Sequence, residues 1–324
     1  MREEILRELE LDYEQQRLRN EQEETRRKEQ IRQEYPGIRS LCEAREELVL
    51  GNLRGILAGN TAAADLPEKM AELNADIRTA LRDAGLPEDY LAPIYRCPVC
   101  RDTGYTGEPV REMCACMKQA YAEKVRGRIG LDGAKAETFE NYDENVIPDG
   151  TIAGSRLTQR ALTGMARKTC HAWADRWPET VNRDMLLTGK SGLGKTFLMR
   201  CMANRLIERG YNVLLVSAGR FFQAARNHYF GNDEEELNEM LEADVLMIDD
   251  LGTEPMMQNI TVEQLFRVIN ERQNANRPTV ISTNLDLGEL KMRYTERIMS
   301  RMSDPRSCTV VTLAGQDIRL RGGA

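Results

Sequence analysis

The spacing of apolar and polar residues separates a helical first part of the chain from an alternating last part. Up to about residue 91, apolar residues are sparse or recur three and four positions apart, which predicts helices. Tyr35-Pro-Gly should break them, and Ile38–Leu57 and Leu66–Ala84 resume with clearer amphipathic spacing. The stretch up to Glu34, with 8 basic and 11 acidic residues, is either a solvated, salt-bridged helix or an arm that docks on a partner protein. We expect residues 1–91 to form a helical, partner-binding region.

Two patterns follow this region. Residues 92–120 are rich in turn residues and cysteine, and residues 121–136 form a short linker. From residue 137 to residue 324, short β-branched runs alternate with helical stretches, which is typical of a parallel α/β sheet. The expected strands are Met185–Thr188, Val213–Val216, Val245–Ile248, Thr279–Thr283 and Cys308–Leu313.

Composition excludes several classes of function. The 45 Lys and Arg against 52 Asp and Glu give a net charge of −7, which excludes a uniformly basic nucleic-acid coat but allows a local basic groove. The longest apolar runs are too short to span a bilayer, and the N-terminus lacks the apolar core of a secretory signal. Four of the 8 cysteines lie close together, which suits a metal site in a reducing compartment. We therefore expect a cytoplasmic protein without a membrane partner.

The cysteine cluster predicts a structural zinc site. Cys97-Pro-Val-Cys100 is followed, after a turn-rich loop, by Cys114-Ala-Cys116. A CxxC turn brings two thiolates to one side, and a second close pair completes a tetrahedral sulfur site with no position left for chemistry. Since the segment has few apolar residues, bound zinc would supply folding energy that a core cannot. Unliganded cysteines or a redox pair are the alternative.

A phosphate-binding loop gives the strongest signal in the chain. The octapeptide matches GxxxxGK[ST] between an expected strand and a helical run, so its backbone N–H groups and the helix N-terminus would bind phosphates. Its residues are Gly189, Lys190, Ser191, Gly192, Leu193, Gly194, Lys195 and Thr196. Lys195 should reach the β- and γ-phosphates, and the Thr196 hydroxyl should ligate Mg²⁺.

Polar residues at two strand ends complete the expected site. Asp249 and Asp250 follow a buried strand; Asp249 would hold Mg²⁺, directly or through water, and Asp250 would polarise the attacking water. Glu fills the second role more often, so the shorter Asp250 predicts slow hydrolysis or dependence on a partner subunit. Asn284, at the tip of another strand, can orient the same water, or it can be a turn-forming residue.

Together these motifs resemble the AAA+ ATPases, and among them the DnaC/DnaI-type loaders of the replicative helicase. The strings that carry the resemblance are Cys97–Tyr105, Cys114–Cys116, Thr138–Tyr142, the P-loop, Ile248–Gly252, Ser282–Asn284 and Glu296–Met302. The resemblance implies a P-loop AAA+ parallel-sheet ATPase domain, preceded by a helical N-terminal region and a small zinc-binding module. Since few residues follow the last expected strand, it also implies a truncated lid, as in loaders of this type.

The same resemblance gives roles to three arginines. Glu296–Met302 resembles the arginine-finger motif, in which Arg301 would reach the ATP of a neighbouring subunit and Arg297 would support the interface. Both can instead be ordinary helix-surface arginines. Arg319 would take the place of the arginine that the lid normally supplies.

Partners are implied in the same way. The helical region and the zinc module would bind a DnaB-type hexameric helicase, and the ATPase domain would assemble on itself and contact single-stranded DNA. The stretch Arg220–Tyr229 interleaves arginines with aromatic residues, which suits phosphate contact and base stacking. Phe221 and Phe222 can instead belong to the core.

The motifs predict an ATPase, and the resemblance implies ATP-dependent loading of a DnaB-type helicase onto single-stranded DNA at the start of DNA replication. ATP or ADP, Mg²⁺ and Zn²⁺ are the expected cofactors, and hydrolysis of ATP to ADP and phosphate is the expected reaction. One alternative is an IstB-like transposition helper, against which the cysteine module and the charged helical arm speak. Another is a nucleotide-binding adaptor with little turnover, which Asp250 and the truncated lid leave open.

Overall fold

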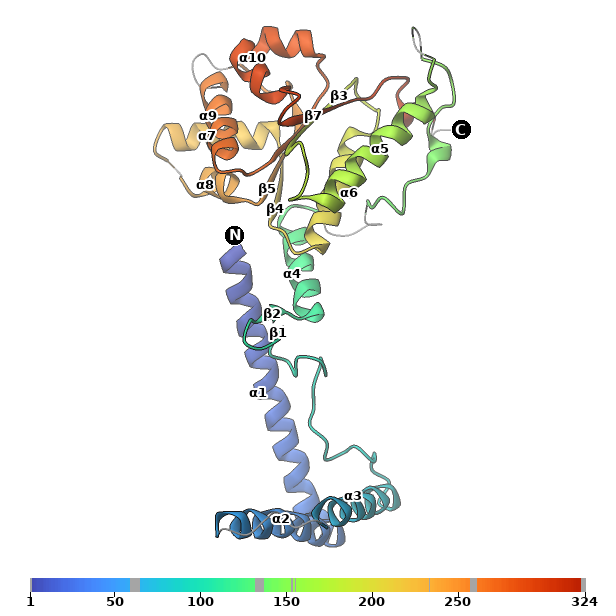
Figure 1. Cartoon of the computed structure of the whole chain (residues 1–324), viewed down its shortest axis with the longest axis vertical. Helices are drawn as coiled ribbons and strands as arrows, with labels where there is room; N and C mark the ends of the chain where they lie inside the picture. Colours follow the sequence, from blue (N-terminus) through green and yellow to red (C-terminus); the bar gives the residue numbers. More distant parts are fainter. Residues whose placement is uncertain are drawn as a thin grey trace. The chain divides into compact units, whose positions relative to one another are not determined.

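Two compact units make up the chain in its computed structural model (Figure 1). The structure describes residues 2–58, 65–131, 137–152, 154, 156–232, 234–256 and 261–321. One unit covers residues 7–116, and the other covers residues 1–6 together with residues 117–324. The phosphate loop and the expected sheet belong to the second unit, and the four clustered cysteines belong to the first.

Three helices open the chain, as the apolar spacing predicts. They are α1 (Arg2–Glu34), α2 (Pro36–Leu57) and α3 (Leu66–Asp83). Pro36 begins α2, where its missing N–H costs nothing because the first N–H groups of a helix have no partner within it. α2 packs on α3, and a buried cluster joins the helices through Ile31, Ile38, Ile77 and Leu81.

A small hairpin and a helix follow in the cysteine region. The hairpin pairs β1 (Tyr105–Thr106) with β2 (Glu112–Met113), and α4 (Ala115–Arg128) begins directly after it. Helix α4 continues into the segment that we expected to be a linker, because Tyr121, Ala122 and Val125 present an apolar face that is buried. Of that expected linker, residues 132–136 lie outside the described residues.

The second unit contains the predicted parallel sheet, and the α/β fold class is confirmed. Its strands lie in the order β4-β5-β6-β3-β7, and every neighbouring pair is parallel. They are β3 (Asp184–Thr188), β4 (Val213–Ser217), β5 (Val245–Leu251), β6 (Thr279–Thr283) and β7 (Cys308–Thr312). Every residue of the central strands β3 and β6 is buried, as expected for parallel strands with helices on both faces.

Helices cover the sheet on both faces (Figure 1). The connection from β3 to β4 passes over two strands in one direction, and the later connections return in the other direction. Because such crossovers are right-handed, α6 lies on one face and the later helices lie on the opposite face. The helices of this unit beyond α4 are α5 (Gln159–Arg176), α6 (Lys195–Glu208), α7 (Ala218–Tyr229), α8 (Glu235–Glu242), α9 (Thr261–Asn274) and α10 (Leu287–Met302).

Two short 3₁₀ helices flank this architecture. They are η1 (Glu144–Val146), before α5, and η2 (Ile318–Arg321), after β7. Beyond β7, η2 is the only helical element in the part of the chain that the structure describes, and the truncated lid stays a prediction. The carboxyl ends of β3, β5 and β6 meet at one edge of the sheet, which is where ligands bind in folds of this kind.

Candidate functional site

The phosphate loop connects β3 to α6, as its motif requires. Gly189, Gly192 and Gly194 have φ values of 145°, 76° and 90°, a range that side chains strongly disfavour. A Cβ atom at Gly189 would lie 2.2 Å from the carbonyl oxygen of Leu313, and one at Gly192 would lie 1.9 Å from the carboxylate of Asp317. These glycines are therefore required both by the turn and by the strand and segment packed against it.

Lys195 is held at the centre of the loop. Its Nζ donates to the carbonyl oxygens of Gly189 and Lys190 at 2.7 and 2.9 Å and to Oδ1 of Asn284 at 2.7 Å. Burial lowers the pKa of Lys195, and the negative charges of Asp250 and Asp249 act in the opposite direction. The Lys195 ammonium therefore donates only to neutral oxygens. A phosphate that enters the loop can take over these hydrogen bonds and add a negative charge beside the ammonium.

The two acids of β5 point to different partners. Asp249 accepts a hydrogen bond from the Ser282 hydroxyl, which in turn accepts the backbone N–H of Asp250 at 2.9 Å. Asp250 has a φ of 58°, and the register of β5 against β6 shifts between Ile248 and Leu251. This irregularity aims the Asp250 carboxylate at Nδ2 of Asn284, 3.2 Å away. Lys195, Asn284 and Asp250 thus form one connected group.

A cavity of about 430 Å³ opens beside this group. Its polar side is lined by the P-loop from Ser191 to Thr196, with Asp250 and Asn284; Asp249 is not among its lining residues. Its apolar side is lined by Tyr142, Val146 and Ile147, from the segment before α5, and by Phe197 and Ile318. One polar and one apolar side match the phosphates and the base of a nucleotide.

The segment before α5 was missed as a functional element by the sequence analysis. The ring of Tyr142 lies 4.9 Å from the guanidinium of Arg167 and 6.2 Å from the ring of Phe197. The string Thr138–Tyr142 had contributed only to the family resemblance, and no periodicity signals that it would return to the P-loop. Its position depends on long-range packing.

The chain after β7 lies against the P-loop. Nη2 of Arg319 donates to Oγ of Ser191 at 2.9 Å, and the N–H of Ile318 donates to the carbonyl of Gly192 at 2.9 Å. The amide of Gln159 exchanges two hydrogen bonds of 2.8 Å with the backbone of Gln316 and so fixes this segment. The structure therefore brings Arg319 to the wall of the nucleotide cavity.

Arg301 and Arg297 are not among the residues that line this cavity. Both belong to α10, and their guanidinium carbons lie 5.0 and 3.9 Å from the ring centre of Phe266. Arg297 is exposed and Arg301 is half-buried. Neither residue takes part in the Lys195 group of its own chain.

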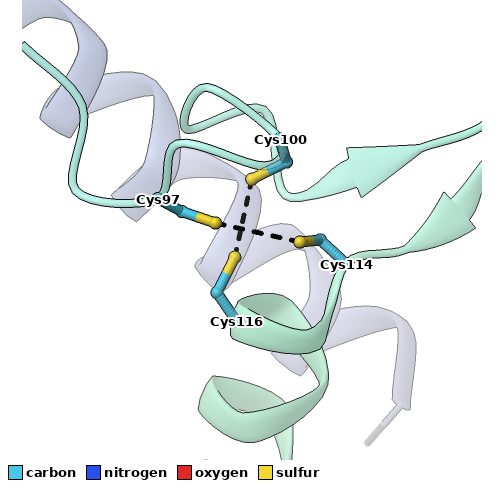
Figure 2. Close-up of side chains that lie close together, drawn as sticks. All are labelled: Cys97, Cys100, Cys114 and Cys116. Atoms are coloured by element: carbon cyan, nitrogen blue, oxygen red, sulfur yellow. Dashed lines mark hydrogen bonds between the residues drawn. The ribbon is translucent and has the colours of Figure 1, made fainter.

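The four clustered cysteines converge in the other unit (Figure 2). All four sulfur atoms lie within 4.8 Å of one another, with Cys97 opposite Cys114 at 3.9 Å and Cys100 opposite Cys116 at 3.5 Å. A tetrahedral zinc site with Zn–S bonds of ~2.3 Å places its sulfurs ~3.8 Å apart, so the residues present fit that ion. The N–H of Cys100 lowers the pKa of Cys97 to about 7, which favours a thiolate there.

Helix α1 supports this cluster from outside. The buried carboxylate of Asp102 accepts hydrogen bonds from the N–H groups of Arg96 and Cys97 at 2.9 and 2.7 Å and from Nδ2 of Asn20 at 2.9 Å. The Tyr13 hydroxyl hydrogen-bonds to Cys116. Such contacts orient metal ligands in known sites, and sequence spacing does not predict them.

The aromatic residues of α7 divide differently from the expectation. Phe221 is fully buried and cannot stack on a base, so the prediction of a DNA contact is wrong for this residue. Phe221 belongs to the core, which was the alternative. Tyr229 and Phe230, at the end of α7, are 52% and 59% exposed, with ring centres 5.3 Å apart. Arg220 pairs with Glu236 at 2.7 Å.

Comparison with known families decides the identity of the second unit. The sequence model described as IstB-like ATP binding protein matches residues 162–323, which is half of the chain. The chain belongs to the IstB-like ATP binding proteins. The match covers the P-loop, Asp249, Asp250, Asn284, Arg301 and Arg319. The cavity described above thus lies in an ATP-binding domain.

Relatives of this IstB-like protein include replicative helicase loaders. DnaI of Bacillus subtilis (strain 168) is 34% identical over 114 residues, which are 35% of this chain and 37% of DnaI. DnaC of Escherichia coli (strain K12) is 30% identical over 131 residues, which are 39% of this chain and 52% of DnaC. A crystal structure of DnaI, 22% identical, covers 56% of this chain and 90% of that chain, with a TM-score of 0.43. The IstB-like protein therefore spans about half or less of the length of these two loaders.

Membrane insertion finds no support in this IstB-like protein. Within the described part of the chain, every helix is too short or too polar to cross a lipid bilayer. This agrees with the absence of long apolar runs in the sequence.

Proposed function

We propose that this protein is an ATPase that loads a DnaB-type replicative helicase onto single-stranded DNA. The observation that carries the ATPase half of the proposal is the connected group of Lys195, Asn284 and Asp250 at the wall of the cavity. The names of the DnaI and DnaC relatives support the loader half. The expected cytoplasmic location belongs to the same proposal.

In this proposal the cavity holds ATP with the phosphates on the P-loop. The N–H groups of the loop and the Lys195 ammonium would bind the phosphates, and Arg319 would approach from Ser191. Tyr142, Val146 and Ile147 would cover the base. Burial already lowers the pKa of Lys195, so pairing it with a phosphate recovers part of the cost of burying this ammonium.

Hydrolysis needs an oriented water and a balanced charge. Thr196 and Asp249 would hold Mg²⁺, which neutralises phosphate charge when it is bound. Asp250 accepts from Asn284 in the structure, and we propose that the two residues hold the attacking water between carboxylate and amide. The products are ADP and inorganic phosphate.

The proposed site is shared between subunits. Arg301 of a neighbouring subunit would place its positive charge beside the γ-phosphate and stabilise the negative charge of the transferring group. Arg301 of the same chain does not line the cavity. Arg297, stacked on Phe266, would support that interface. The protein would then turn over ATP only when assembled.

The cysteine cluster would hold a structural zinc ion. The four sulfurs already have near-tetrahedral spacing, and four protein ligands leave no position for chemistry. We propose that this module and the three N-terminal helices bind the helicase, and that the ATPase unit contacts single-stranded DNA. The exposed Tyr229 and Phe230 are the aromatic candidates for that contact.

A loading assay tests the proposal. The protein, a DnaB-type helicase from the same source and closed circular single-stranded DNA are combined with ATP, and the helicase retained on the circles is measured. Circles have no ends, so retention requires that the helicase ring be opened or assembled around the strand. We expect retention with the wild type and none with Lys195→Ala.

Two outcomes would contradict the loader. If the helicase is retained on the circles equally well without this protein, the protein is not required for loading. Capture of a transposase instead of the helicase from the source organism would favour the transposition helper, which the named relatives do not.

A further inference from the structure

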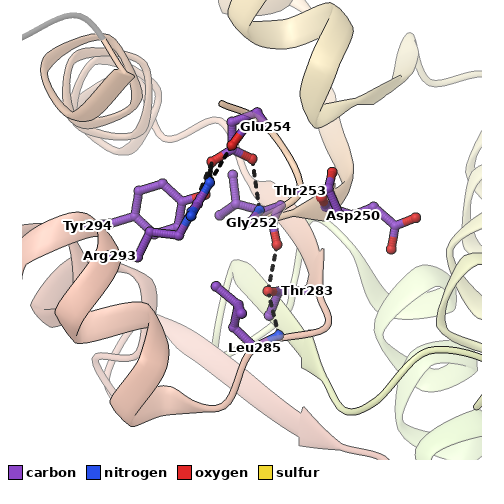
Figure 3. A network of polar contacts seen from close by, with 9 residues as sticks. Asp250, Gly252, Thr253, Glu254, Thr283, Leu285, Arg293 and Tyr294 are labelled. Carbon is purple, nitrogen blue, oxygen red and sulfur yellow. Dashed lines mark hydrogen bonds and ion pairs between the residues drawn. The ribbon is translucent and has the colours of Figure 1, made fainter. Parts of the chain in front are cut away.

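Glu254 carries a built polar site that the nucleotide chemistry does not use. Its side chain is only 1% exposed, yet its carboxylate has partners on two different elements (Figure 3). Oε2 accepts the N–H of Gly252 at 2.8 Å, while Oε1 accepts the Tyr294 hydroxyl and lies 3.3 Å from Nη2 of Arg293. A buried carboxylate is costly unless it is fully paired, so the cluster depends on all of these partners.

One side of this cluster is the turn that sets Asp250. Thr253 Oγ1 donates to the Asp250 carbonyl at 2.9 Å, and Asp250 itself has a left-handed backbone with φ of 58°. Gly252 has φ of 107°, and a Cβ atom there would lie 2.7 Å from the side chain of Leu285. The bond from Gly252 to Glu254 closes this strained turn, so it helps to fix where the Asp250 carboxylate points.

The other side of the cluster is the bend of α10. Arg293 and Tyr294 end the first half of the helix, and Thr295 has φ of 76° and ψ of 157°, which no helix contains. A β-branched residue in this conformation is strained, so the contacts around it must hold it there. The second half of α10 carries Arg297 and Arg301. Glu254 therefore holds the residue directly before the bend that orients Arg301.

These contacts form a continuous path from the P-loop to α10. Lys195 bonds Asn284, Asn284 bonds Asp250, and the Asp250 turn is closed by Glu254, which bonds Tyr294. A phosphate that takes the Lys195 ammonium away from Asn284 would change the first link. Burial, followed by the bond to Glu254, raises the pKa of Tyr294, so its hydroxyl keeps the proton that it donates.

We propose that Glu254 and Tyr294 are positioning residues that couple a subunit's own nucleotide site to the Arg301 it offers to its neighbour. The inference rests on the proposed function, in which Arg301 acts in trans. Neither residue lines the nucleotide cavity; the pair sets the bend at Thr295 according to the state of the Asp250 turn. ATP in one subunit would thus prepare the next active site along the assembly.

Hydrogen–deuterium exchange of the full chain tests the coupling without hydrolysis. With a non-hydrolysable ATP analogue and Mg²⁺, the wild type should change its exchange at residues 250–254 and also at residues 295–302. In Tyr294→Phe the change at 250–254 should remain and the change at 295–302 should disappear. Tyr121→Phe is the matched control, since it removes another buried hydroxyl, one without a hydrogen-bond partner among the described residues.

Mixing variants shows in which direction the pair acts. Tyr294→Phe alone should bind ATP nearly normally and lose about 10–100-fold in kcat, the loss expected from a misplaced group. Mixed with Asp250→Asn, which still binds ATP and offers an intact Arg301, it should regain turnover; mixed with Arg301→Ala, it should not. Glu254→Gln should follow the same pattern and serves if Tyr294→Phe folds poorly.

The outcomes separate this inference from the proposed function. If the wild type binds no nucleotide, both fail. If the wild type responds to nucleotide at both segments and Tyr294→Phe responds in the same way, the coupling is wrong while the ATPase proposal stands. Rescue by Arg301→Ala instead of Asp250→Asn would also overturn the inference, because the pair would then act on its own Asp250.

Discussion

The nucleotide site and the cysteine cluster are both convergences of residues, but different forces hold them. Lys195, Asp250 and Asn284 stand at the ends of α6, β5 and β6, whose buried strands keep them in place whether or not a ligand is present. The cysteines lie in a turn before a small hairpin, directly after that hairpin and at the start of α4, in a segment with few apolar residues. We expect the first site to be fixed by the hydrophobic core and the second to depend on a bound ion.

This difference predicts different effects for substitutions in the nucleotide site and for substitutions in the cysteine cluster. Removing a side chain from the nucleotide site should remove chemistry and leave the fold, because the sheet does not depend on it. Removing a cysteine should loosen residues 92–116 and leave nucleotide binding, because the sheet belongs to a separate unit. The following predictions test that contrast, beginning with the largest effect.

Arg301→Ala should lower kcat by roughly 10³-fold or more while ATP affinity stays near that of the wild type, since an arginine finger stabilises only the transferring phosphate. Steady-state turnover and equilibrium titration of a fluorescent ATP analogue give the two numbers. Arg306→Ala, which removes an arginine with 88% side-chain exposure, is the matched control and should keep full turnover. Equal losses in both variants would refute a specific role for Arg301.

Asp250→Asn should keep ATP binding and lower kcat by about 10²-fold or more, the range of a lost general base. Its amide can still meet Asn284, so the turn should persist and the thermal unfolding midpoint should change little. Asp175→Asn neutralises a carboxylate that pairs with Arg205 on α5 and α6, and it should leave turnover unchanged. Parent-rate hydrolysis by Asp250→Asn would mean that another acid orients the water.

Lys195→Ala should weaken ATP binding by about 10–100-fold, the size expected for lost charge-assisted hydrogen bonds. Circular dichroism should show an unchanged fold. The oxygens that accept from Lys195 belong to the loop backbone and to the Asn284 side chain, and none of them pairs the strands of the sheet. ATP affinity equal to that of the wild type would place the phosphates elsewhere.

Cys97→Ser should release zinc and change ATP affinity by less than about twofold, since the cluster belongs to the other unit. Elemental analysis of protein purified without chelator should give about one zinc per wild-type chain. Cys42→Ser removes a cysteine outside the cluster and should retain the ion. Wild-type protein without zinc, or a large loss of ATP affinity in Cys97→Ser, would break the contrast between the two sites.

Local chemistry explains what the sequence predicted. Some features depend only on neighbouring residues in the sequence, as do the P-loop motif, the apolar strands and the CxxC spacing. The structure forms the expected strands, loop and cysteine group. Contacts between distant segments were not predictable. Tyr142 reaches the cavity, Arg319 meets Ser191, and Tyr294 meets Glu254 only because the sheet brings their segments together.

The spacing of residues in a helix also failed to predict which aromatic side chains are buried. The Arg220–Tyr229 pattern does not reveal that Phe221 faces the core while Tyr229 remains exposed. The left-handed backbone of Asp250 and the bend at Thr295 leave no mark in the residue types, since neither position is a glycine. Strained positions of this kind require the surrounding structure to impose them.

ATP turnover by a mixture of two inactive variants tests the central claim, an ATPase site shared between subunits. Arg301→Ala contributes an intact cavity, and Asp250→Asn, which still binds ATP, contributes an intact Arg301; with random assembly of equal amounts, about a quarter of the interfaces combine both. With helicase and single-stranded DNA present, each variant alone should be inactive and the mixture should recover turnover to about that fraction of the wild type. If assembly is demonstrated and the mixture stays as inactive as its parts, the shared site is contradicted.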